Sequence, residues 1–334
     1  MINYFIIIVV VNFLIFKNYR LISKYYNIFD YPDGLRKRHK NPTPLIGGLI
    51  FIFNLFIFYL YEYYFSFNLS FFNIKIEIIY FLITSFLFFL IGYIDDRFQL
   101  NPNLKLLTFA ILILILIIFD KELIIQDVIF TFDMNFSFSY FGYFFTILCF
   151  LLFINAFNML DGINGQAGGY SIFISIAFIF NAINTIFFIL LIIITTIFLI
   201  YNFKNKMFLG DSGTLLIGFI FSYFFVKSYN IGNNIYPDEI VLIMLIPGYE
   251  LLRLAIQRII KKKHPFRPDE NHIHHLILKH SNFLKTYLIV QILLVFPYLS
   301  YLIIKSTIVS LIISTALYSL IVVYYKNKKI KASN

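Results

Sequence analysis

The chain has 334 residues, of which 60% are hydrophobic and 13% are charged, and its mean hydropathy is +0.83. A soluble protein of this length is excluded, because its surface would have to be as apolar as its core. The formal net charge of +10 does not indicate a partner nucleic acid here, because the distribution of the basic residues carries membrane topology instead.

Long apolar runs without period-two alternation predict transmembrane α-helices. The expected fold is an all-α polytopic membrane protein, and residues 1–334 are interpreted as a single membrane domain. The first sixteen residues lack a basic start and a small-residue cleavage site, which indicates a retained first span. Eleven spans are expected, at roughly 3–17, 45–63, 76–94, 104–119, 139–157, 167–181, 184–201, 213–227, 240–259, 284–303 and 306–324.

The basic residues predict the orientation of these spans. With the N-terminus outside, 23 of the 27 Lys and Arg residues fall inside, and Lys75, Lys121, Lys227 and Lys305 fall outside. This asymmetry favours an outside N-terminus and a cytoplasmic C-terminus. Alternating apolar and polar residues near 125–139 predict a small β-hairpin at the outer surface.

In the first inside loop, residues 30–48, a basic run at 36–40 is followed by two prolines and two glycines. Lys37 and His39 are its candidate binding residues. Such a loop suits an anion held close to the backbone at a helix N-terminus. The alternative is that its charge only signals the inside of the membrane.

The second cluster is the pair Asp95 and Asp96 at the end of an apolar run, with Lys105 nine residues further on. Adjacent carboxylates are costly in hydrocarbon, so we expect the helix to end there at a water-facing surface. They also need a counter-charge such as Mg²⁺, a basic side chain or a shared proton. The alternative is an ordinary helix end with two solvated aspartates.

The third and fourth clusters supply oxygen atoms. Asn155, Asn158 and Asp161 lie three residues apart, which places them on neighbouring rows of one helix face. Asp211 lies between two glycines at the inner start of a later span. Hard oxygen ligands near glycine-rich turns suit a divalent cation or a nucleotide close to the backbone. The alternative for the amides is hydrogen bonding to neighbouring helices.

The fifth cluster is rich in histidine. His272, His274 and His275 suggest zinc, but no Cys lies near them and contiguous histidines cannot easily close a tetrahedral site. The lone Cys149 lies in an apolar run, which also excludes disulfides. We therefore favour charge-assisted hydrogen bonds from the imidazoles and Arg267 to a phosphate group.

Together these clusters indicate metal-assisted phosphoryl chemistry at one membrane face. They resemble the motifs of the polyprenyl-phosphate N-acetylhexosamine-1-phosphate transferases, membrane enzymes that start bacterial glycan assembly. The matching motifs are Arg36-Lys37-x-His39 with Pro42, Pro44, Gly47 and Gly48; Gly92-x-x-Asp95-Asp96 with Lys105; Asn155-x-x-Asn158-x-x-Asp161-Gly162 with Gly165; Phe208-x-Gly210-Asp211-x-Gly213; and Pro265-Phe266-x-Pro268-Asp269-x-x-His272-Ile273-His274-His275.

The resemblance implies a phosphoglycosyltransferase of the bacterial cytoplasmic (inner) membrane, with its active site facing the cytoplasm. It implies transfer of N-acetylglucosamine-1-phosphate, or a related N-acetylhexosamine-1-phosphate, from a UDP-sugar to undecaprenyl phosphate. UMP would be released and a lipid-linked surface glycan begun. The implied cofactor is Mg²⁺, with Mn²⁺ as an alternative; the implied partners are the two substrates and membrane lipids, and a homodimer is compatible with it. The main alternative is a transporter or scramblase of an anionic or lipid-linked solute.

Roles for single residues follow from the resemblance together with the chemistry. Asp211 is expected to be the principal Mg²⁺ ligand, with Asn158 as a second. Asp95 would deprotonate or orient the lipid phosphate, and Asp96 would support the metal or Lys105. The expected substrate-binding residues are Lys37, His39, Lys105, Asn155, Asp161, Asn164, Phe208, Arg267, His272, His274 and His275, with Asn164 and Phe208 engaging uracil.

Three positions depart from the family pattern. Asn164 and Glu250 each stand where the family usually has Asp, and Gln166 stands where it usually has Leu. The first two departures concern nucleotide binding and leave the implied reaction class unchanged.

Overall fold

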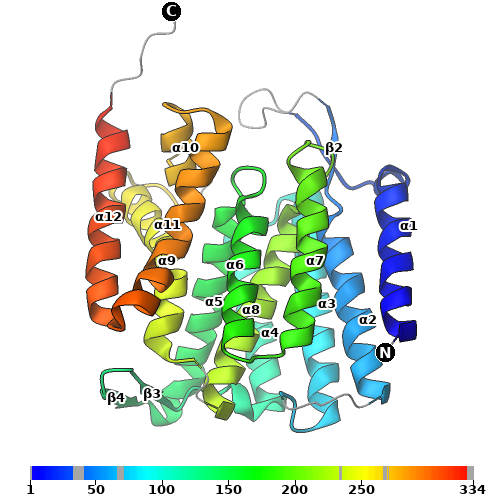
Figure 1. Ribbon diagram of the computed structural model, residues 1–334, viewed down its shortest axis with the longest axis horizontal. Coiled ribbons are helices and arrows are strands. Elements are labelled where there is room, and N and C mark those ends of the chain that lie inside the picture. Colours follow the sequence, from blue (N-terminus) through cyan, green and yellow to red (C-terminus); the bar gives the residue numbers. More distant parts are fainter. Residues whose placement is uncertain are drawn as a thin grey trace, which may run out of the picture.

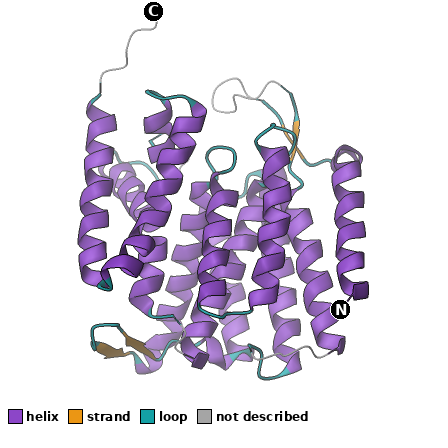
Figure 2. Cartoon of the chain, viewed as in Figure 1, coloured by secondary structure: helices purple, strands orange, loops and turns teal. Residues whose placement is uncertain are grey.

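The computed structural model describes residues 2–32, 41–65, 71–232, 235–265, 269 and 271–328. These residues form a helical bundle with a two-stranded sheet at each end (Figures 1 and 2). The elements are α1 Ile2–Tyr26, β1 Phe29–Asp30, β2 Thr43–Pro44, α2 Gly47–Phe65, α3 Lys75–Phe98, α4 Pro102–Phe119, the 3₁₀ helix η1 Lys121–Leu123, β3 Asp127–Ile129, β4 Asn135–Ser137, the 3₁₀ helix η2 Ser139–Phe141, α5 Gly142–Leu160, α6 Gln166–Phe180, α7 Thr185–Asn202, α8 Gly210–Gly232, α9 Pro237–Ile260, α10 Ile273–Leu278, α11 Phe283–Ile304 and α12 Thr307–Asn327.

Each predicted span corresponds to one helix of the structure, and α10 is a further, short helix outside the predicted spans. Nine helices of the described ranges are long and apolar enough to cross a membrane. Of the other two, α6 has only 15 residues, and α9 carries several charged side chains. Helix α1 continues past the predicted end of its span to Tyr26, with a kink at Asn18. The all-α polytopic fold is therefore confirmed.

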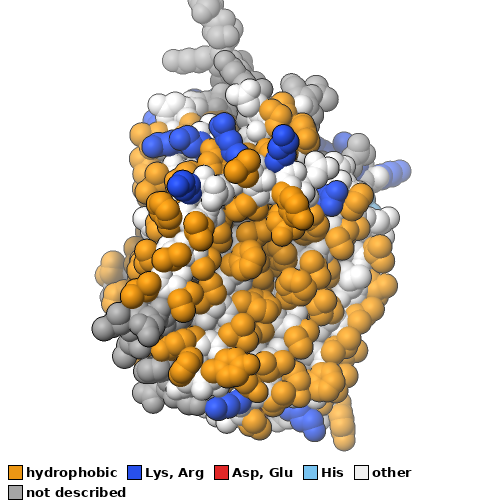
Figure 3. Space-filling view, turned by 90° about the vertical axis from the view of Figure 1, so that its right-hand side faces the viewer, with side chains coloured by type: hydrophobic (Ala, Val, Ile, Leu, Met, Phe, Trp, Pro, Cys, Tyr) orange, Lys and Arg blue, Asp and Glu red, His pale blue; other side chains and the backbone are white. Residues whose placement is uncertain are grey.

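Apolar side chains cover the middle of the bundle surface. Figure 3 shows one such face, with Lys and Arg side chains near its upper and lower margins. Ile292 of α11 and Leu320 of α12, for example, are 62% and 68% exposed. A continuous apolar surface of this kind would be unstable in water but suits contact with lipid chains.

Helix α8 lies at the centre of the bundle, packed against α2, α3 and α5. Its side chains are buried from Ser212 to Tyr229. Phe219 stacks on Phe88 of α3, with ring centroids 4.7 Å apart and an interplanar angle of 11°. Each end of this buried helix carries a cluster of charged side chains.

Glycines let the first turn of α8 approach its neighbours. A Cβ atom on Gly92 would lie 2.4 Å from the carbonyl oxygen of Asp211, and one on Gly48 would lie 2.6 Å from Ser212 Oγ. Gly210, the first residue of α8, has φ +72°, which favours glycine. We expected Gly48 to let an anion approach the backbone; here Gly48 and Gly92 let α2 and α3 approach the first turn of α8.

The two strand pairs lie at opposite ends of the bundle (Figure 1). Strands β3 and β4 pair antiparallel, with Val128 opposite Phe136, which confirms the predicted hairpin. Strands β1 and β2 pair at the end where α10 lies. Helix α1 begins and α12 ends at opposite ends of the bundle, as an odd number of crossings requires. Which end faces the cytoplasm stays a prediction from the basic residues.

Candidate active site

Three predicted residues from α3, α4 and α8 meet at one end of the bundle. Lys105 Nζ lies 2.5 Å from Asp95 Oδ2 and 3.4 Å from Asp211 Oδ2. Asp95 Oδ1 also accepts the backbone N–H of Leu100 at 2.7 Å. The counter-charge expected for the aspartates is therefore present, and it joins two carboxylates that are distant in sequence.

A short turn between α3 and α4 creates this contact. Gln99 ends α3 in the left-handed conformation, with φ 50°. Asn101 caps α4 by accepting the N–H of Asn103, and Pro102 stands in the first helical turn, where a missing N–H does no harm. The turn brings Lys105, in the first turns of α4, against Asp95 in the last turn of α3.

Asp96 is engaged by the backbone of α8. Its Oδ1 accepts the N–H of Asp211 at 2.7 Å, and its Oδ2 accepts the N–H of Ser212 at 3.0 Å. The first N–H groups of a helix have no partner within the helix, and they attract negative charge. Asp96 thus caps α8 from another helix. We expected Asp96 to support either the metal or Lys105, and among the described residues no ion pair joins it to Lys105.

Asp211 and Asp161 are the accessible carboxylates of this end. The Asp211 side chain is 36% exposed, whereas that of Asp95 is 9% exposed. Asp161 is exposed just after α5, and within the described ranges no side-chain hydrogen bond or ion pair engages it. Partial desolvation by the protein packed around it, and then the charge of Asp211, raise the pKa of Asp161 to about 7. Both groups can therefore accept a cation or a donor from a ligand.

The two predicted amides of α5 have different surroundings. Asn158 Oδ1 accepts the hydroxyl proton of Thr214 at 2.5 Å. An amide oxygen has two lone pairs, so one remains for a cation. Asn155 Nδ2 donates to the carbonyl of Leu151 in its own helix at 2.7 Å, and no described contact joins it to the aspartates. We did not predict Thr214, although it lies one turn after Asp211.

The residues expected to engage uracil lie in two adjoining loops. Asn164 Nδ2 donates to the Asn202 carbonyl at 3.0 Å and to Asn205 Oδ1 at 2.7 Å. These bonds tie the α5–α6 loop to the end of α7. Phe208 is half-buried, and its backbone N–H donates to the Pro44 carbonyl at 2.8 Å. The side-chain oxygen of Asn164 has no described partner.

The predicted histidines lie at and within α10. His274 is 2% exposed, its Nε2 has no hydrogen-bond partner among the described residues, and its ring packs on Gly162. The ring centroid of His274 lies 5.3 Å from that of His272 and 4.3 Å from that of His275. Burial lowers the pKa of His272 to about 4 and the pKa of His274 well below its usual range. Both are therefore neutral near pH 7, so each can donate one N–H to a phosphate, and the charge that strengthens this bond comes from the phosphate alone.

Three candidate residues, Lys37, His39 and Arg267, lie outside the described residues. The contact of His274 with Gly162 brings α10 next to Asp161, which in turn influences Asp211 electrostatically. The aspartates, Lys105 and the histidine helix therefore lie at the same end of the bundle.

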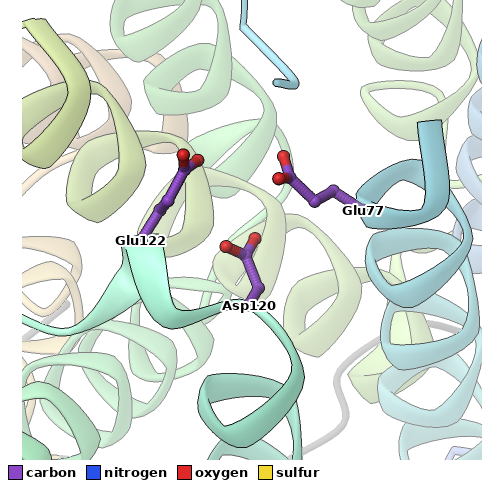
Figure 4. Close-up of side chains that lie close together, drawn as sticks. All are labelled: Glu77, Asp120 and Glu122. Atoms are coloured by element: carbon purple, nitrogen blue, oxygen red, sulfur yellow. The ribbon is translucent and has the colours of Figure 1, made fainter. Parts of the chain in front are cut away.

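A second charged cluster lies at the opposite end of α8. Figure 4 shows the carboxylates of Glu77, Asp120 and Glu122 pointing toward one another, an arrangement that could hold a metal ion. However, Lys227 Nζ lies 2.5, 3.0 and 3.2 Å from these carboxylates, respectively. We had placed Lys227 at the outer end of a span, but it is fully buried within α8. Its ammonium supplies the cation, so we do not assign the magnesium site here.

Comparison with known proteins agrees with the motifs. The model of glycosyl transferase family 4 matches residues 78–229. The chain is also 31% identical over 274 residues to the undecaprenyl-phosphate alpha-N-acetylglucosaminyl 1-phosphate transferase of Escherichia coli. The alignment covers 78% of this chain and 71% of the relative. The chain belongs to this transferase family.

Other family members of the same name are similar. The Thermotoga maritima protein is 28% identical over 286 residues, 84% of this chain and 83% of the relative. The Salmonella typhi protein is 29% identical over 269 residues, 75% of this chain and 69% of the relative. The resemblance drawn from the motifs is therefore confirmed, and the chain is a multi-pass membrane phosphoglycosyltransferase.

Proposed function

We propose that this transferase moves an N-acetylhexosamine-1-phosphate, in the first instance N-acetylglucosamine-1-phosphate, from a UDP-sugar to undecaprenyl phosphate. UMP is released, and the lipid-linked sugar starts a surface glycan. The reaction takes place at the cytoplasmic face of the bacterial inner membrane. The observation that carries the proposal is the convergence of Asp95 and Asp211 on Lys105 at one end of the bundle, in a chain whose relatives are named for this transfer.

The proposed chemistry is an in-line transfer at phosphorus. An oxygen of the lipid phosphate bonds to the β-phosphorus of the UDP-sugar, the bond to the bridging oxygen breaks, and UMP leaves with the electron pair. Such a transfer depends on alignment and charge neutralisation. Lys105 can hold a phosphate oxygen by a charge-assisted hydrogen bond. Asp95 contacts Lys105 and would accept the proton of a protonated lipid phosphate.

Asp211 and Asn158 are the proposed ligands of Mg²⁺. An accessible carboxylate and an amide oxygen are hard donors of the kind this ion prefers, and Asp161 offers a further carboxylate nearby. When bound, the ion would neutralise phosphate charge. Asp96, which holds the backbone N–H of Asp211, would keep this ligand in position.

The remaining candidates would surround the nucleotide and sugar. His272 and His274 offer neutral imidazole groups, and His275 lies on the same helix, whose His274 packs on Gly162 beside Asp161. The side-chain oxygen of Asn164, which has no partner among the described residues, would bind uracil, and Phe208 lies in the adjoining loop. We keep Asn155 as a weaker candidate, because its amide bonds to its own helix.

The transporter alternative is not favoured. A transporter places polar groups near the middle of the membrane, at broken helices. Along the central helix α8, by contrast, every side chain between Leu215 and Phe221 is apolar and no more than 1% exposed. This apolar stretch separates the aspartate cluster from the Lys227 cluster.

The proposal is tested with the purified full chain in lipid nanodiscs. Undecaprenyl phosphate, Mg²⁺ and a panel of UDP-sugars are supplied, and released UMP is measured together with the lipid product. We expect UMP release to require both the lipid phosphate and a UDP-N-acetylhexosamine. UMP release without lipid product, or no turnover with any donor, would contradict the proposal.

A further inference from the structure

The carboxylate of Glu250 in α9 receives hydrogen bonds from three elements. Its Oε1 accepts the hydroxyl proton of Tyr318 in α12 at 2.5 Å and Arg253 Nε at 2.9 Å. Its Oε2 accepts Arg253 Nη2 at 2.9 Å and the backbone N–H of Ile273 at 2.8 Å. Glu250 is 3% exposed, so it forms a buried ion pair with Arg253. All the lone pairs of its carboxylate accept hydrogen bonds.

The same cluster holds the start of the histidine helix α10. Ile273 is the first residue of α10, and the preceding His272 makes no side-chain capping bond. Without such a cap the backbone N–H of Ile273 would have no partner, and Glu250 accepts its hydrogen bond instead. Arg253 Nη2 donates to the carbonyl of Asn271 at 2.8 Å. The backbone is thus held on both sides of His272.

The orientation of α10 matters because of His274. This residue directly follows Ile273, and its ring packs on the backbone of Gly162, the residue after Asp161. Its Nε2 is buried without a partner among the described residues. A small rotation of α10 would move this imidazole away from the aspartate end of the site.

We propose that Glu250, Arg253 and Tyr318 are positioning residues, which join α12 to the histidine helix and fix His272 and His274 for the UDP-sugar. This inference rests on the proposed function. It means that α12, which contributes no candidate residue to the site, acts on the site through Tyr318. The competing explanation is that the cluster only fastens α9 to α12.

A matched pair of variants separates the two explanations. Tyr318→Phe removes the hydroxyl that bonds to Glu250. Tyr249→Phe removes a hydroxyl that bonds to Thr315 Oγ1 at 2.7 Å. Both bonds join α9 to α12, but only the first belongs to the cluster that holds α10. Glu250→Gln is a further variant that retains the shape of the side chain but not its charge.

Two readouts are needed, and the first does not depend on activity. Amide hydrogen exchange of the segment 271–279 in nanodiscs should become about tenfold faster in Tyr318→Phe, because the hydroxyl that bonds to both Glu250 and Arg253 is lost. Tyr249→Phe should leave this exchange unchanged. In the transfer assay, Tyr318→Phe should raise the KM for the UDP-sugar about tenfold, with kcat changed by less than about threefold.

Each outcome decides a separate point. Equal exchange in Tyr318→Phe and Tyr249→Phe would overturn the coupling, even if Glu250→Gln fails to fold. Faster exchange with an unchanged KM would overturn the positioning role. If the wild-type chain turns over no UDP-sugar, the proposed function fails, while the exchange comparison still decides whether the cluster holds α10.

Discussion

Asp96 Oδ1 accepts the backbone N–H of Asp211 at 2.7 Å, across 115 positions of the sequence. The bond ties the end of α3 to the start of α8, where Gly92 allows the two helices to touch. Two adjacent aspartates thus have different roles in the fold. Asp95 holds the lysine, and Asp96 holds the backbone of the proposed metal ligand.

Asp96→Asn should lower both stability and activity. The new NH₂ group would face a backbone N–H and leave it unpaired, at a cost of about 1–3 kcal/mol. We expect a lower thermal midpoint, a higher Mg²⁺ concentration for half-maximal rate and kcat/KM reduced at least about tenfold. As a control, Asp95→Asn should reduce activity with less effect on the midpoint, because it leaves the α8 cap intact. An Asp96→Asn enzyme with normal midpoint and normal turnover would contradict the capping role.

Asp211→Asn should abolish turnover in a protein that still folds. The substitution removes the charge of one hard ligand at an accessible helix end, so Mg²⁺ binding weakens. Adding a chelator to the wild type should have the same effect on UMP release, and restoring Mg²⁺ should reverse it. Asp133→Asn is the matched control, since Asp133 is exposed on the far hairpin with φ 61°, which Asn also tolerates. Mg²⁺-dependent activity close to the wild type in Asp211→Asn would refute the assignment.

The helices were predictable from sequence because each apolar run is long enough to cross much of the membrane. The contacts of Asp96 were not, since they depend on how α3 and α8 pack in three dimensions. The burial of Lys227 was not predictable for a related reason. A single charge at the end of an apolar run indicates a loop, and its partners Glu77 and Asp120 come from distant segments. Glu250 was noticed only as a departure from the family pattern, because its bonds cross from α9 to α10 and α12.

Membrane orientation is tested by cysteine labelling. The chain has one cysteine, so Cys149→Ser gives a background without thiols. Single cysteines at Arg97 and Lys279 should be protected from an impermeant reagent in intact cells, whereas one at Lys121 should react. The reason is that 23 of 27 basic residues lie on one side in the predicted topology. Reaction at Arg97 or Lys279 from outside would invalidate the shared cytoplasmic site.

Lys227→Met should destabilise the protein without entering the chemistry. It leaves three carboxylates without the ammonium that they share, and breaking a buried ion pair costs about 3–5 kcal/mol. The thermal midpoint in nanodiscs should fall well below that of Lys121→Met, an exposed control in η1 at the same end. Turnover per folded molecule should stay within about twofold of the wild type. A midpoint that drops on chelation of divalent ions even in the Asp211→Asn variant would instead indicate a metal at this cluster.

Asn164→Ala tests whether the amide serves the fold, the substrate or both. Its Nδ2 donates to the Asn202 carbonyl and to Asn205 Oδ1, so its loss should cost about 0.5–1.5 kcal/mol per hydrogen bond. Its side-chain oxygen is the atom that we propose for uracil, which presents an N–H between two carbonyl groups. Asn205→Gly removes one of the same bonds from the other side and tolerates the φ of 52° at that position. If the oxygen binds uracil, Asn164→Ala should raise the KM for the UDP-sugar well above that of Asn205→Gly. The kcat should stay nearly unchanged, because the lost bond stabilises the bound substrate and the transition state equally. Equal KM values in the two variants, with parallel losses of thermal stability, would restrict Asn164 to holding the loop against the end of α7.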